Sequence, residues 1–159
     1  LTLGDRTMKT IYLSPLLALI CLAMTSYGVE YKAASRLQFP VELLPSDSAK
    51  VPIYLENQIA IVLSAENIVR ARNLLGDQGE RLADEMKAIS ANRIGGSSTI
   101  VIQCTSTDPV LCANYANALA SAYTNWHQAT FTNSIVQPFV IQKAQAAGPP
   151  KPIYQRMFE

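Results

Sequence analysis

Residues 98–126, STIVIQCTSTDPVLCANYANALASAYTNW, decide the fold, because they predict a strand followed at once by a long helix. The β-branched residues within 98–105 are typical of a strand. Asp108 and Pro109 predict the helix start, since a carboxylate at the N-cap accepts backbone N–H groups and proline suits the first helical turn. Apolar side chains then recur at helical spacing and predict one buried stripe. The stripe comprises Cys112, Tyr115, Ala116, Leu119, Ala122, Tyr123 and Trp126.

Upstream of this stretch, residues 30–39 (EYKAASRLQF) alternate in polarity with a period of two. One face carries Tyr31, Ala33, Ser35, Leu37 and Phe39, and the other carries Glu30, Lys32, Arg36 and Gln38. The alternation predicts a strand with one buried and one solvated face, in an antiparallel or mixed sheet that helices cover on one side.

The segment between these two strands predicts helices. Residues 53–75 have an apolar stripe at helical spacing, and Ser64 divides them by capping a second piece that ends at Gly76. The spacing of Asp77 and Glu80 is typical of a capping box and predicts a short helix through Met86.

Two further strands complete the predicted sheet. Residues 87–93 form a hairpin with 98–105 through a turn at Gly95-Gly96, and residues 139–142 form the last strand. The resulting order, β-α-β-β-α-β, predicts an α+β domain of the ferredoxin-like type over residues 30–146, with the helices on one face of a four-stranded sheet.

A membrane segment is predicted ahead of this domain. Residues 10–29 (TIYLSPLLALICLAMTSYGV) contain no charge, and about 20 such residues span the hydrocarbon core as a helix. Arg6 and Lys9 precede it, so residues 1–9 form a cytoplasmic arm and the main domain is exported. A cleaved secretory signal is the alternative, although residues 23–25 lack the small-x-small pattern of a cleavage site. Both interpretations export residues 30–159.

The composition argues against several classes of function. With 49% hydrophobic residues and a net charge of +1, the chain suits neither a disordered protein nor a nucleic-acid binder. His127 is the only histidine, which leaves no imidazole-based metal cluster and no supported catalytic triad, and we expect it at an edge or exposed end of its helix. Asp84 and Glu85 are adjacent in a helix and point apart. We therefore expect no enzyme, metal or cofactor.

Cys104 and Cys112 form a candidate disulfide. Cys104 shares strand parity with Ile100 and Ile102, so it faces the helices, while Cys112 lies on the buried stripe of the next helix. In an oxidising compartment a bond between them would close a short loop and contribute about 2–3 kcal/mol. The alternative is two small buried hydrophobic side chains.

Four stretches resemble the Wzz-type chain-length determinants, or polysaccharide co-polymerases, of bacterial envelopes. The first is Tyr31-Lys32-Ala33-Ala34, which follows the apolar segment, and the second is Gln58–Arg70 with Ser64 at its centre. The third runs from Ser98 to Tyr123 and contains Asp108-Pro109 and Ala116-Asn117-x-Leu119-Ala120. The fourth, Ala146-Ala147-Gly148-Pro149-Pro150-Lys151-Pro152, resembles the proline-rich run before the family's second membrane helix.

The resemblance implies a short family member without enzymatic activity. Several copies would form a ring on the bacterial inner membrane and act with a polymerase on nascent lipid-linked glycan, setting the length of an O-antigen, capsule or exopolysaccharide. Lys32 and Arg36, on the polar strand face, are candidate contacts between copies. The second membrane helix would follow the proline-rich exit segment 147–159, because residues 153–159 are too few to span a bilayer.

Two alternatives remain open. The first is an adaptor or activator of a cytoplasmic tyrosine kinase, which requires a second anchor and a cytoplasmic tail. The second is an exported, non-enzymatic binding domain released by signal cleavage.

Overall fold

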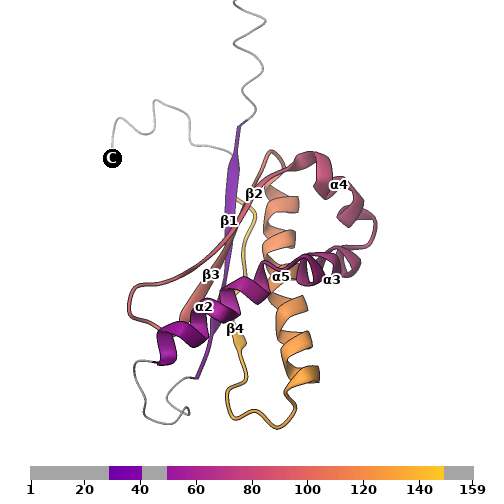
Figure 1. The fold of residues 1–159 in the computed structure, drawn as a ribbon. Helices are drawn as coiled ribbons and strands as arrows, with labels where there is room; N and C mark the ends of the chain where they lie inside the picture. Colours follow the sequence, from indigo (N-terminus) through magenta and orange to yellow (C-terminus); the bar gives the residue numbers. More distant parts are fainter. Residues whose placement is uncertain (1–28, 41–49, 149–159) are drawn as a thin grey trace, which may run out of the picture.

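The computed structural model describes residues 29–40 and 50–148 of the chain. The elements are β1 (Tyr31–Gln38), α2 (Lys50–Val62), α3 (Ala65–Leu75), α4 (Asp77–Glu85), β2 (Met86–Arg93), β3 (Thr99–Ser106), α5 (Pro109–Thr130) and β4 (Phe139–Gln142) (Figure 1). In these described ranges no helix combines the length and apolarity needed to cross a membrane. The predicted membrane helix lies outside the described residues except for Val29, as does the exit segment beyond Gly148.

The four strands form one sheet in the order β2-β3-β1-β4, and every neighbouring pair is antiparallel. The start of β1 lies opposite the end of β3, where Tyr31 pairs with Ser106. On the other side of β1, Arg36 pairs with Gln142 of β4, with an irregularity beside it. The predicted α+β class with a four-stranded sheet is confirmed.

One face of the sheet is covered, as the alternation in β1 predicts. Leu37 and Phe39 are fully buried, whereas Lys32 and Arg36 are exposed. The Phe39 ring packs against Tyr54 of α2 and Tyr123 of α5, at centroid distances of 6.2 and 6.1 Å. Both helices therefore cover the same sheet face, and Figure 1 shows α3 and α4 grouped beside α5.

The helix ends follow the predicted capping. Ser64 accepts a hydrogen bond from the backbone N–H of Asn67, and Gly76 ends α3 with a φ of 55°. Asp108 caps α5 by accepting from the N–H groups of Val110 and Leu111. A left-handed φ of 46° at Gly95 shapes the β2–β3 turn.

Several element boundaries differ from the sequence prediction. The first helix begins at Lys50 rather than residue 53. Met86 begins β2 instead of ending α4, because its pairing with Ser106 extends the sheet by one position. The strand predicted over 98–105 is displaced by one residue to Thr99–Ser106.

Candidate functional site

The candidate site is a hydrogen-bonded clamp, made by Ser35, Asn117 and Ala144, that holds the segment after β4. Asn117 Oδ1 accepts from the Ala144 backbone N–H at 2.7 Å, and Asn117 Nδ2 donates to the Ala144 carbonyl at 3.0 Å. The Ser35 hydroxyl donates to Asn117 Oδ1 at 2.6 Å and lies 3.2 Å from the Ala144 nitrogen. One carboxamide thus bonds both polar groups of a single backbone residue.

The local structure explains why these three residues meet. Ser35 is on the inward face of β1 and is fully buried, so its hydroxyl needs partners inside the domain. Asn117 is on the side of α5 that packs near β1. Ala144 lies two residues beyond the end of β4. Its backbone groups form hydrogen bonds with side chains of β1 and α5, where a residue of the strand would pair with a neighbouring strand.

The clamp directs the chain toward the end of the domain at which it began. Because β4 runs antiparallel to β1, residues after Gln142 proceed toward the start of β1. Figure 1 shows this last described segment, in yellow, returning along β1 toward the start of that strand. Ala146 is exposed and lies just past the clamp. Both ends of the described domain therefore lie at the same end of the sheet.

The predicted cysteine pair lies at this same end of the sheet. Both thiols are free and buried. Cys112 Sγ donates to the carbonyl of Cys104 at 2.9 Å, and it also lies 3.4 Å from the carbonyl of Tyr31. Desolvation raises the pKa of Cys104 to about 12 and that of Cys112 above its ordinary value, so both remain protonated at neutral pH.

Oxidation of this pair stays a prediction. We expect a Cys104–Cys112 disulfide in protein isolated from an oxidising compartment, since strand and helix bring the two residues into one layer of the core. Mass spectrometry of non-reduced, alkylated protein detects this disulfide. Two alkylated thiols would instead establish a pair of buried hydrophobic side chains.

The uncovered sheet face carries the two candidate contact residues. Lys32 and Arg36 are exposed on β1, and among the described residues neither has a carboxylate partner. Their neighbours across β3 are Thr105 and Val101. The nearby acid, Glu30, forms an ion pair with Lys87, whose Nζ lies 3.0 Å from Glu30 Oε1. The face therefore has two unneutralised positive charges beside neutral side chains.

His127 is buried, and the prediction of an edge or exposed position was wrong. Its side chain is 3% exposed and packs between Tyr123 and Phe131, whose ring centroids lie 5.9 and 4.9 Å away. Nδ1 lies 3.2 Å from Gln137 Oε1, and Gln137 Nε2 donates to the Phe131 carbonyl. The turn after α5 folds back over the imidazole and excludes water.

We expect His127 to make the domain sensitive to acid. Desolvation lowers its pKa below the ordinary value of 6.5, so the folded state favours the neutral imidazole. The stabilisation is therefore complete above pH 6.5 and is lost as the pH falls from there toward the lowered pKa. Urea titrations at several pH values should show this loss, and H127Q should flatten that part of the profile. An identical profile for both proteins would refute the assignment.

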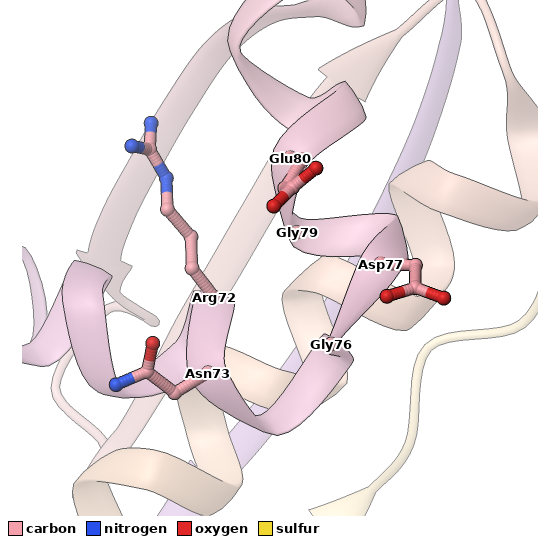
Figure 2. Close-up of a pocket in the computed structure, with 6 residues that line it drawn as sticks. All are labelled: Arg72, Asn73, Gly76, Asp77, Gly79 and Glu80. Carbon is pink, nitrogen blue, oxygen red and sulfur yellow. The ribbon is translucent and has the colours of Figure 1, made fainter.

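The hollow at the α3–α4 junction lacks a converging set of reactive groups. It has a volume of about 490 Å³ and is lined by Arg72, Asn73, Gly76, Asp77, Gly79 and Glu80. Figure 2 shows the Arg72 and Asp77 side chains pointing away from each other. In the part of the chain that the structure describes, no group of three His, Cys, Asp or Glu side chains could hold a metal ion.

The remaining predicted residues have structural positions in the core or at caps. Ala33 is buried opposite Cys104, and Pro109 occupies the first turn of α5. Tyr123 is buried and donates from its hydroxyl to Gln58 Oε1 at 2.7 Å. Pro149 and Pro152 lie outside the described residues.

Sequence reasoning identified Asn117 only through the family resemblance, and it missed Ser35 and Ala144 as its partners. The signal that was available is a serine among the apolar residues of the buried face of β1. Comparison with known proteins adds nothing to this assignment: no family model and no curated protein matches the chain.

Proposed function

We propose that this chain is a membrane-anchored polysaccharide co-polymerase that sets the length of a surface glycan as a homo-oligomer. The observation that supports the proposal most directly is the position of the two ends of the domain. The start of β1 follows the apolar segment 10–29, and the Asn117 clamp directs residues 144–148 toward the same end of the sheet. A domain held between two membrane anchors requires this arrangement.

The strand order supports the same proposal. In the order β2-β3-β1-β4, each of the two β-α-β units has a strand of the other unit between its own strands, which is the ferredoxin-like pattern. The first and last strands are consequently neighbours, so the two connections to the membrane are side by side. The anchors would confine the copies to two dimensions and raise their effective concentration.

The proposal is tested by deleting the gene and separating the surface glycan by size on a gel. We expect the modal chain length to change, and we expect the wild-type gene supplied on a plasmid to restore it. An unchanged ladder would contradict the proposal. The same gel on a strain that carries only residues 30–159, without the apolar segment, should resemble that of the deletion strain.

Arg36→Glu should reduce assembly of the full-length protein in detergent. Arg36 is exposed and unpaired on the open sheet face, and reversal of its charge places an acid where a neighbouring copy would have met a cation. Size-exclusion chromatography with light scattering measures the assembly. The matched control is K143E, an exposed lysine just past β4. If R36E and wild type form assemblies of equal size, the open sheet face is not the interface between copies.

A further inference from the structure

A groove between α3 and α5 lies on the helical side of the domain, away from the open sheet face. Its wall comprises Arg70, Asn73 and Leu74 of α3 with Asn125, Trp126 and two alanines of α5, around a volume of about 450 Å³. This size lies within the range of roughly 300–1,000 Å³ that is usual for ligand pockets. A smaller hollow of about 320 Å³ shares Leu74 with it and extends along α5 from Ser121 to Asn117 of the clamp and on to Asn114. The two hollows together suit an extended ligand.

The apolar part of the groove is centred on Trp126. The indole is half-buried, and it packs against Tyr123 and Phe131 at centroid distances of 6.0 and 5.8 Å, so its orientation is fixed. Leu74, which is 55% exposed, faces solvent at the junction of the two hollows. A rigid aromatic edge and an aliphatic side chain offer contact area for apolar C–H groups.

The polar part of the groove is formed by neutral amides. Asn73 and Asn125 are exposed, and no side-chain hydrogen-bond partner occupies either of them among the described residues. A carboxamide both donates and accepts, which matches a hydroxyl group. Two such groups beside one indole form a surface for a ligand with many hydroxyls.

The charge of the groove favours a neutral ligand. Arg70 is the charged residue of the wall, and its Nη2 lies 3.2 Å from Glu66 Oε2 while its Cζ lies 5.8 Å from the centre of the Trp126 ring. The exposed ion pair offsets part of this charge, and the guanidinium lies between Glu66 and the Trp126 ring. A polyanion would meet little uncompensated positive charge here.

We propose that this groove binds a stretch of neutral glycan, an inference that rests on the proposed co-polymerase function. The edge of the indole, whose ring Arg70 covers, and Leu74 contact the C–H face of a sugar ring, and Asn73 and Asn125 form hydrogen bonds with its hydroxyls. Binding along α5 places the growing glycan on the helical side of the domain and leaves the sheet face for neighbouring copies.

The test uses the full-length chain in detergent and the surface glycan of its host, released by mild acid and fractionated by size. Trp126 is the single tryptophan, so its fluorescence reports on the groove directly. We expect a saturable change on titration with the glycan. Because a hydrogen bond contributes about 0.5–1.5 kcal/mol, loss of two should weaken binding at least about fivefold in N73A/N125A. N92A removes an exposed amide on β2 and should bind like wild type.

The outcomes separate this proposal from the function on which it rests. Equal glycan binding by N73A/N125A and wild type, or no saturable change in fluorescence, would overturn the proposal that the groove binds glycan. This holds even if gene deletion alters glycan length. Lost binding with an unchanged ladder would support the groove and contradict length control. If Trp126 fluorescence instead depends on protein concentration without glycan, and N125A reduces the assembly, the groove joins copies and the glycan proposal fails.

Discussion

Gly79→Ala should destabilise the domain by about 2 kcal/mol, although alanine is normally the better helix former. A Cβ at this position would lie 2.5 Å from the backbone oxygen of Arg72 and 3.1 Å from its carbonyl carbon. Backbone atoms inside α3 cannot move aside as a flexible side chain would, so α4 must shift away from α3. Overpacking of this kind typically costs about 1–3 kcal/mol and exceeds the propensity gain of up to about 1 kcal/mol.

Chemical denaturation of G79A and G96A, each compared with wild type, measures the effect. Gly96 lies in the exposed β2–β3 turn, and a Cβ there has no atom within 4 Å, so G96A controls for the change in chain entropy. We expect a lower denaturation midpoint for G79A alone. Equal or greater stability of G79A would show that α3 and α4 are farther apart than the structure places them. Figure 2 shows Gly79 beside Arg72 at this junction.

The features that the sequence predicted correctly are those with a local physical cause. The period of two in 30–39 identified the buried face of β1, because alternate side chains of a strand point to opposite sides. Ser64 and Asp108 identified two helix starts, since a capping side chain bonds to amides two or three residues away. Such signals need no knowledge of the rest of the chain.

The candidate site depends on contacts between distant residues, which a single sequence does not encode in a readable pattern. Ser35 is separated from Asn117 by 82 residues and from Ala144 by 109. His127 was misplaced for a similar reason: the helix alone puts it near an exposed end, but the turn containing Gln137 folds back over it. A turn without hydrophobic periodicity gives no warning of this.

Asn117→Ala should release the segment after β4 while leaving the rest of the domain folded. The variant loses both hydrogen bonds to Ala144 and the bond from Ser35, and it leaves the Ala144 carbonyl without a partner. An unsatisfied buried polar group costs about 1–3 kcal/mol. Hydrogen exchange at the Ala144 amide should accelerate about tenfold or more, since about 1.4 kcal/mol corresponds to a factor of ten.

The matched control is Asn114→Ala, three residues earlier on the same helix. Asn114 Nδ2 donates only to the exposed Gln78 Oε1 at 3.1 Å, so its loss should change stability by less than about 0.5 kcal/mol. If the backbone amides of residues 143–148 exchange at the same rate in N117A and N114A, the clamp does not hold the segment after β4.

We also expect the clamp to affect glycan length, beyond its effect on the stability of the domain. If it transmits the position of a second anchor to α5, N117A should alter modal glycan length while the protein remains folded in the membrane at its normal level. Ser35→Ala should have a smaller effect of the same kind, because Asn117 keeps both bonds to Ala144. The double variant should then resemble N117A, since residues of one network are not additive. Fully additive changes in exchange rate and glycan length would mean that Ser35 and Asn117 act independently on the segment after β4, and not as one clamp.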